Sequence, residues 1–180
     1  MPITGGNKVK NAFYKYVADV QENTLESAIS VLDYVGLECV KEARIAGKYT
    51  DRTGNLRSST GYAVVYNGRI IRQSNFEKVH GQGENSQLVD FVVKKGKNKG
   101  KRVHYWVKGA SGDGSEGSRT GKELLYQLVL QYNNGLVLIL VAGMDYAVHV
   151  EARGYNVLNS AEDLARRLVP EMLREAGLRK

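Results

Sequence analysis

The stretch Thr50–Thr60, TDRTGNLRSST, lies between a long helical pattern and the clearest hairpin signal in the chain. Thr53 can cap a short helical turn through its hydroxyl, and Gly54 permits a tight backbone there. Leu56 is the only large apolar side chain of the segment and is expected to anchor it in the core. The stretch therefore predicts a rigid connector that fixes the angle between a long helix and a sheet.

Before the connector, apolar residues recur at three- and four-residue steps from Lys8 to Ala46, which is typical of an amphipathic helix. A single helix over this range would be about 58 Å long, which exceeds the size of a small domain. We therefore expect a break, and the capping-box spacing of Asn23 and Glu26 predicts the start of a second helix there. Gly47 is placed to end it.

After the connector, residues 61–75 predict a β-hairpin, because Asn67-Gly68 separates two runs rich in β-branched residues. Two further runs, LVDFVVKK and RVHYWVK, are joined by GKNKG and predict a second hairpin. The Gly- and Ser-rich segment 109–121 has no large apolar side chain to bury and is predicted to be a mobile loop.

In residues 122–132, polar residues at four-residue steps favour a helix, with a strand as the alternative. The apolar run LVLILVAG, residues 136–143, is typical of a central buried strand. A last helix is expected from Ser160, with Pro170 kinking it or starting a short final helix. The predicted class is α+β: a long N-terminal helix with an expected break and a C-terminal helix, packed on an antiparallel sheet built from hairpins.

Composition indicates one globular domain over residues 1–180, with a flexible N-terminus at residues 1–7. The chain has 42% hydrophobic residues and a net charge of +7, which favours an acidic partner such as a phosphate backbone, an anionic membrane surface or an acidic protein ring. Cys39 is the single cysteine, so an internal disulfide is excluded and a buried apolar role is expected. No signal-peptide pattern or membrane-length apolar run occurs, which predicts a soluble protein.

The sequence shows no established catalytic motif. His149 and Glu151 are two residues apart and would share one face of a strand, but no Cys/His cluster completes a metal site. With Asp145 they are the only support for a metal-dependent hydrolase. A nuclease built from Asp145, Glu151 and Lys108 has only generic spacing behind it. We expect neither enzymatic activity nor a metal, a cofactor or a small-molecule substrate.

The dense basic block KKGKNKGKR is the other functional candidate. On a hairpin tip its side chains would neutralise phosphates of a nucleic acid, which defines the alternative function of a nucleic-acid-binding module. The competing interpretation is a solvated tip whose charges prevent edge-to-edge strand pairing. The candidate phosphate contacts are Lys94, Lys95, Lys97, Lys99, Lys101 and Arg102.

Two motifs in this order, TGNLRSS and AGMDYAVHVEARG, resemble those of the tail-completion (head–tail joining, or neck) proteins of long-tailed bacteriophages and prophages. Members of that family often have a proline before the first motif and a Pro-Phe segment after the second, whereas this chain has KYTD and GYNVLNSAEDL. The matching positions are Thr53, Gly54, Leu56 and Ser59 in the first motif and Tyr146, Ala147, Val150, Glu151 and Gly154 in the second.

The resemblance implies a non-enzymatic structural protein of the virion that forms a ring, expected to be six-fold, at the neck or tail end. Its implied partners are copies of itself and the neighbouring head-connector or tail-tube proteins, with DNA passing through the ring and no membrane contact. The matched residues are then candidates for subunit contacts. Tyr146 would be an aromatic anchor, and Glu151 would pair with Arg52 or Arg57 of a neighbour; the alternatives are intrachain packing and a local salt bridge.

Overall fold

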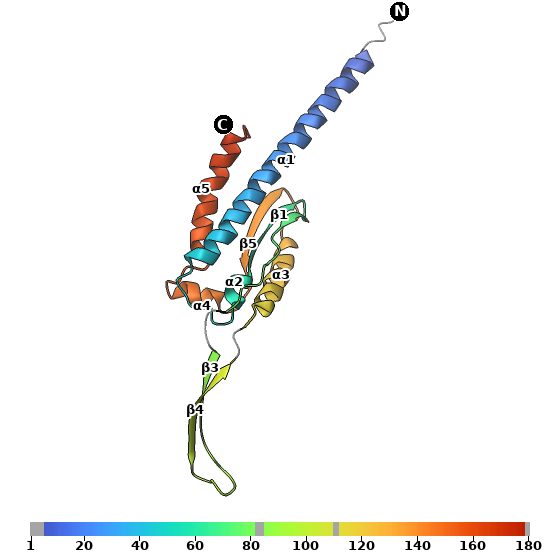
Figure 1. The fold of residues 1–180 in the computed structure, drawn as a ribbon. Helices are drawn as coiled ribbons and strands as arrows, with labels where there is room; N and C mark the ends of the chain where they lie inside the picture. Colours follow the sequence, from blue (N-terminus) through green and yellow to red (C-terminus); the bar gives the residue numbers. More distant parts are fainter. Residues whose placement is uncertain (1–5, 82–84, 110–111, 179–180) are drawn as a thin grey trace, which may run out of the picture.

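The computed structural model describes residues 6–81, 85–109 and 112–178. It has an elongated shape with a helical arm at one end, a hairpin at the other and a helix–sheet body between them (Figure 1). In chain order the elements are α1 (Gly6–Ala46), α2 (Asn55–Ser58), β1 (Thr60–Tyr66), β2 (Arg69–Gln73), β3 (Asn85–Val92), β4 (Arg102–Gly109), α3 (Ser115–Val129), β5 (Leu136–Ala142), α4 (Ala147–Ala152) and α5 (Asn159–Glu175).

The body is built on a three-stranded antiparallel sheet with the order β2-β1-β5. The predicted turn between β1 and β2 is confirmed, because Asn67 and Gly68 both have positive φ, 50° and 78°. The predicted strand at residues 136–143 is also present as β5. It lies at an edge of the sheet rather than in its centre, because β1 takes the central place.

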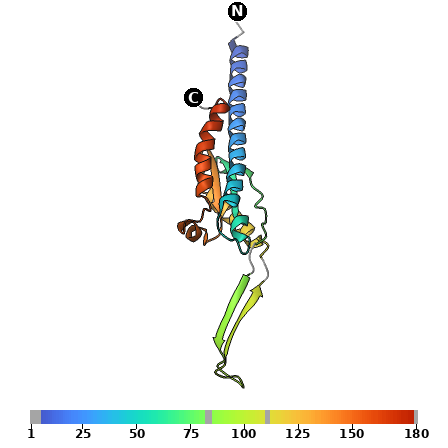
Figure 2. The same ribbon diagram turned by 60° about the vertical axis from the view of Figure 1, so that its left-hand side comes forward.

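Helices cover both faces of this sheet. On one face, Ala63 and Val65 of β1 pack with Leu125 and Val129 of α3. On the other face, alternate residues of β1 and β5 pack against α1 and α5, which run side by side (Figures 1 and 2). Since both faces are buried, the apolar residues of β1 and β5 form nearly continuous runs instead of alternating with polar ones.

The first helix is unbroken over 41 residues, so the expected break is wrong. Asn23 and Glu26 lie inside α1, and the Asn23 carbonyl accepts a hydrogen bond from the Ser27 hydroxyl at 2.8 Å. The helix is longer than the body of the protein. Its N-terminal part therefore projects beyond the body, and this projecting part is called the arm below (Figure 2). Phe13 of this arm is 61% exposed, and Tyr16 is 67% exposed.

Within the body, α1 lies close to the sheet at Gly36. A Cβ at Gly36 would collide with the ring of Tyr62 in β1. The Tyr62 hydroxyl donates a 2.7 Å hydrogen bond to the Asp33 carboxylate, one turn earlier in α1. Helix and sheet are therefore joined by close packing and by a charge-assisted hydrogen bond.

The predicted second hairpin is present as β3–β4, but it forms a separate two-stranded sheet. It extends from the body at the end opposite the N-terminal arm (Figure 1). The antiparallel sheet of the body therefore contains only one of the two predicted hairpins.

The prediction of a mobile loop at residues 109–121 is wrong for its second half, because α3 begins at Ser115. Residues 110–111 of that segment, and residues 1–5 of the predicted flexible N-terminus, lie outside the described residues. The favoured prediction of a helix in residues 122–132 is confirmed as far as Val129, and the strand alternative is wrong there. Pro170 lies inside α5, which continues to Glu175, so no separate final helix starts there.

Candidate functional site

The connector folds as a tight turn followed by the single-turn helix α2. The Thr53 hydroxyl accepts the N–H of Asn55 at 3.3 Å, and Gly54 has a left-handed φ of 75°. Leu56 is 2% exposed and packs with Ala147 and Val157, which belong to the region of the second motif. The first motif therefore has the anchoring role that its spacing predicts.

The connector also fastens the end of α1 through Arg57. The Arg57 guanidinium donates hydrogen bonds to the carbonyl oxygens of Arg44 and Gly47, each at 3.0 Å, and lies 4.7 Å from the centre of the Tyr49 ring. Carbonyls at a helix C-terminus lack intrahelical partners and carry partial negative charge, so a cation is stabilising there. Arg57 thus has an intrachain role at the end of α1.

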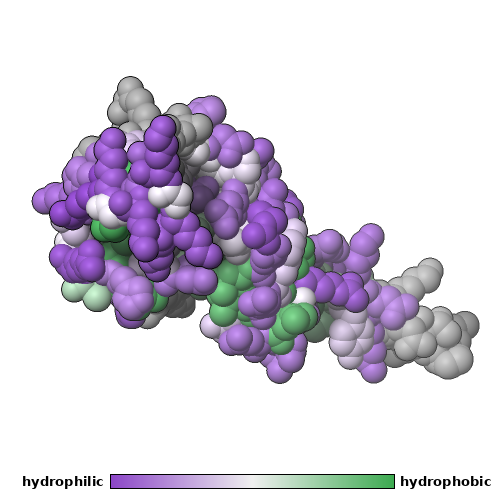
Figure 3. Space-filling model, turned by 90° about the horizontal axis from the view of Figure 1, so that it is seen from below, coloured by the Kyte–Doolittle hydropathy of each residue, from purple (hydrophilic) through white to green (hydrophobic). Residues whose placement is uncertain are grey.

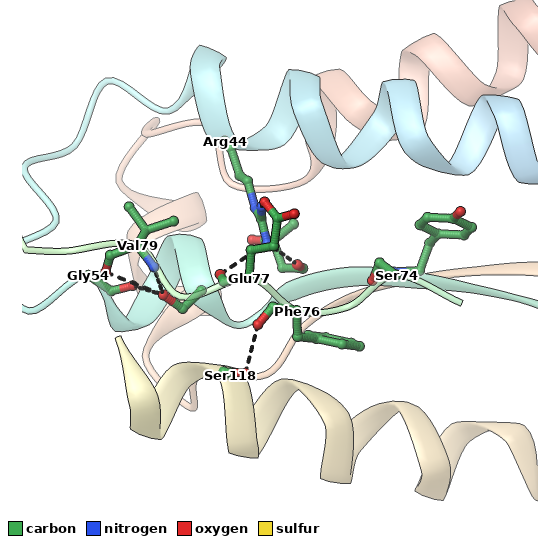
Figure 4. Close-up of polar contacts among 10 residues, drawn as sticks. Arg44, Gly54, Ser74, Phe76, Glu77, Val79 and Ser118 are labelled. Carbon is green, nitrogen blue, oxygen red and sulfur yellow. Dashed lines mark hydrogen bonds and ion pairs between the residues drawn. The ribbon is translucent and has the colours of Figure 1, made fainter. Parts of the chain in front are cut away.

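A second segment, residues 74–81 between β2 and β3, lies against the connector and is called the strap below. Arg44 of α1 contacts the strap at the carbonyl oxygen of Glu77 (3.4 Å) from one side. From the other side, the hydroxyl of Ser118 in α3 donates to the carbonyl oxygen of Phe76 at 2.7 Å (Figure 4). Each contact satisfies a backbone carbonyl that no strand partners.

Strap and connector meet at Gly54 and Ser58. A Cβ at Gly54 would collide with the carbonyl oxygen of Val79 in the strap. The Ser58 hydroxyl accepts the N–H of Val79 at 2.7 Å and donates to the Gly54 carbonyl at 2.6 Å (Figure 4). Sequence reasoning gave Ser58 no role of its own. Its partner Val79 is 21 residues away, so no local pattern indicates the contact.

The second motif forms α4 and the turn into α5. Glu151 accepts hydrogen bonds from the backbone N–H groups of Val157 and Leu158, each at 2.9 Å. Its carboxylate thus satisfies free donors at the start of α5, where negative charge is favoured. Gly154 has a φ of 81° in the connecting turn. Because α4 is a helix and not a strand, His149 and Glu151 do not share a face.

The two motifs meet around a cavity of about 390 Å³ that is open to solvent. Tyr146 is 39% exposed at its rim. Val150 also lines the cavity, whereas Ala147 is buried beside it. Six of the residues that line the cavity are Asp51, Thr53, Leu56, Glu116, Tyr146 and Val150. The structure therefore brings the two motifs together into one junction, although about 90 residues separate them in the sequence.

The chemistry of this junction is that of a packing and hydrogen-bonding surface. Burial raises the pKa of Tyr49 to about 12, and it also raises the pKa of Tyr146. Both phenols therefore remain protonated near neutral pH. The buried Tyr49 hydroxyl has no hydrogen-bond partner within the described parts of the chain. The Asp51 carboxylate, 4% exposed, accepts the N–H of Arg57 at 2.8 Å. Within the described parts of the chain, no three His, Cys, Asp or Glu side chains could hold a metal ion together.

The basic block lies far from the junction, at the tip of the β3–β4 hairpin (Figure 1). Lys94, Lys95, Lys97, Lys99, Lys101 and Arg102 are all exposed. Arg102 forms a two-pronged ion pair with Asp90 across the hairpin, with N–O distances of 2.6 and 2.8 Å. The structure thus separates the two groups of candidate residues into a junction in the body and a charged tip.

Among the residues described by the structure, no helix combines the length and apolarity that a membrane crossing requires. The chain was also compared with protein-family models, curated proteins and solved structures. None of the three comparisons found a match.

Proposed function

We propose that this protein is a structural subunit of a phage or prophage virion, located in the neck or tail-end ring that forms during head–tail joining. It would assemble with copies of itself, with six subunits as the expected number, and contact head-connector or tail-tube proteins. The resemblance of the two motifs suggests this role. One structural observation carries the proposal: the projecting arm of α1 retains an apolar face that α5 does not cover.

That apolar face continues the contact between α1 and α5. Val31 and Val35 of α1 pack against α5 in the body. Phe13, Val17 and Val20 precede them at three- and four-residue steps on the same side of the helix. The 17 residues of α5 extend about 25 Å along α1, which is about 60 Å long, so the arm passes beyond them (Figures 1 and 2).

The arm needs a partner for energetic reasons. Isolated helices are marginally stable in water, and most helical stability in proteins comes from packing of an apolar face. Full burial of a Phe or Val side chain stabilises by about 1.5–3 kcal/mol. Phe13 is 61% exposed and Val20 is 44% exposed, so much of this contribution is still available for a contact with another subunit. In a closed ring every arm has an identical neighbour.

The junction supports the same role. A ring closes only if each subunit presents its contact surfaces at a fixed angle. Arg57 and Ser58 fasten the end of α1 and the strap to one connector. The direction of the arm relative to the sheet is therefore set by hydrogen bonds within the subunit.

The mass of the full chain in solution tests the proposal. We expect the wild-type protein to give the mass of a closed oligomer in light scattering or native mass spectrometry. The triple variant Phe13→Ser/Val17→Ser/Val20→Ser should be monomeric, with the unfolding midpoint of the body unchanged. The control Lys15→Ser/Asp19→Ser/Glu22→Ser alters the opposite, solvent-facing side of the arm and should still assemble.

A second measurement tests the place of assembly. Heads and tails made without this protein should join when the wild-type protein is added, and the triple variant should fail to join them. A wild-type protein that stays monomeric at high concentration and does not join heads to tails contradicts the proposal.

A further inference from the structure

The β3–β4 hairpin carries nearly all of the net charge of the protein. Between Asn85 and Gly109 the sequence has six lysines and one arginine against a single carboxylate, Asp90. These seven positive charges and one negative charge leave +6, out of +7 for the whole chain. The remaining 155 residues are therefore close to neutral, and the positive charge is a local property of the hairpin.

The tip is a defined loop with a specific set of backbone contacts. The N–H of Val93 donates to the carbonyl oxygen of Lys101 at 3.0 Å. The N–H of Gly100 donates to the carbonyl oxygen of Val93 at 2.9 Å. Lys99 donates to Gly96 at 3.0 Å, which closes an inner turn. Gly96 and Gly100 have φ of 88° and 85°, a conformation that glycine adopts without strain. The exposed lysines thus start from fixed backbone positions.

The single carboxylate of the hairpin leaves the tip lysines without an acidic partner on their own element. Asp90 is engaged by Arg102, and the Nδ1 atom of His104 lies 3.3 Å from the same carboxylate. Asp90 and His104 lie on the shaft, and Arg102 is the last residue of the tip. Between Val93 and Arg102 the sequence has no acidic residue.

The tip is also accessible from several sides. The hairpin extends away from the body in both ribbon views (Figures 1 and 2). Seen from below, with the hairpin end toward the viewer, hydrophilic side chains dominate the surface, and the hydrophobic ones form separate patches (Figure 3). A large ligand can therefore approach the tip without meeting the body.

We propose that this tip, residues 94–102, binds the phosphate backbone of double-stranded DNA without regard to base sequence. A two-stranded β-ribbon fits the major groove of B-DNA, which places the lysines near phosphates of both strands. Five of the nine tip residues are lysines, whose flexible ammonium groups bind phosphates as point charges, so phosphate contacts should dominate. This inference does not depend on assembly into a ring.

The same charges would attract an anionic membrane, but the tip lacks the means to insert. Between Val93 and Val103 the sequence contains no apolar side chain to enter the acyl region. The exposed aromatic residues Phe91 and Tyr105 lie lower on the shaft. Duplex DNA, with a phosphate charge about every 1.7 Å along its axis, offers more charges within reach of one loop.

Fluorescence anisotropy with two unrelated 25-base-pair duplexes tests the proposal. For five phosphate contacts, the logarithm of the binding constant should fall with the logarithm of salt concentration with a slope of about −4.5. Both duplexes should bind equally. Replacing the lysines at 94, 95, 97, 99 and 101 by Gln should lower affinity about 100-fold at low salt and bring the slope near zero.

A charge-matched variant provides the control. Gln at Lys41, Lys48, Lys78, Lys122 and Arg153 removes the same charge from exposed positions of the body and should change affinity less than about threefold. Equal losses in the two variants, or unchanged binding by the tip variant, would overturn the proposal. Tip-dependent binding to phosphatidylserine vesicles that exceeds DNA binding at the same salt would overturn it in favour of a membrane surface.

Discussion

The side chain of Ser58 joins the connector to Val79, the strap residue 21 positions further along the chain. Its hydroxyl accepts the Val79 N–H at 2.7 Å and donates to the Gly54 carbonyl at 2.6 Å, and the residue is fully buried. One small side chain thus satisfies a part-buried donor and a buried acceptor on two different segments. The path of the strap therefore depends on this hydroxyl.

Replacing Ser58 by Ala tests this dependence. The part-buried N–H of Val79 and the buried carbonyl oxygen of Gly54 would both lose this partner, which should lower the free energy of unfolding by about 1–3 kcal/mol. Ser27→Ala is the control, because the Ser27 hydroxyl bonds on the exposed surface of α1, and it should change stability by less than about 0.5 kcal/mol. Urea denaturation measures both. Equal midpoints for Ser58→Ala and wild type would show that the strap does not need the hydroxyl.

Gly54→Ala should be far more damaging than Gly96→Ala, although both glycines have a left-handed backbone. At Gly96, φ is 88° and nothing lies within 4 Å of an added Cβ, so only backbone strain of about 1–2 kcal/mol arises. At Gly54 the added Cβ would also collide with the carbonyl oxygen of Val79. Thermal unfolding measures the loss of stability in each variant. The loss in Gly96→Ala reports backbone strain alone, and the additional loss in Gly54→Ala reports the collision with Val79. Similar losses in both would mean that connector and strap can move apart.

Local signals predicted the elements whose structure is determined locally. The turn at Asn67-Gly68 is an example, because its positive φ values depend on these two residues. The helical pattern of α1 was also visible, but the expected break assumed that the helix fits within one domain. Asn23 lies inside the unbroken helix α1, so its capping potential is not used.

Where the sequence-based prediction was wrong, tertiary contacts determine the structure of the segment. The Gly- and Ser-rich start of α3 has the composition of a loop, yet a Cβ at Gly117 would collide with the carbonyl oxygen of Asn55 in α2. The glycines there permit close packing of helices and do not indicate mobility. The junction depends in the same way on contacts across long sequence distances, such as those of Ser58 and Ser118, and no local pattern indicates them.

Glu151→Ala should destabilise the start of α5. The carboxylate accepts the N–H groups of Val157 and Leu158, so its removal should lower the free energy of unfolding by about 1–2 kcal/mol. Glu151→Gln keeps one acceptor oxygen and should lose less. Glu123→Ala breaks only an exposed i,i+4 pair with Arg119 and should cost under about 0.5 kcal/mol. Chemical denaturation of the three variants ranks their free energies of unfolding. A Glu151→Ala variant as stable as the wild type would exclude the capping role of Glu151.

Stability should fall as the pH rises above 9, because buried acidic groups are held in their neutral forms. Burial raises the pKa of the Cys39 thiol from 9.0 to about 11 and that of the Tyr49 phenol from 10.0 to about 12. The unfolded chain releases these protons at lower pH than the folded protein, so alkaline solution stabilises the unfolded state.

For Cys39 alone, the loss in the free energy of unfolding between pH 8 and 11 should be about 2 kcal/mol. Urea denaturation across this range measures it. Cys39→Ala creates a small cavity and lowers stability at every pH, but it also removes the thiol titration and should give a shallower alkaline decline. The same slope in Cys39→Ala and wild type would show that the thiol does not contribute, and a flat wild-type profile would contradict the raised pKa of both groups.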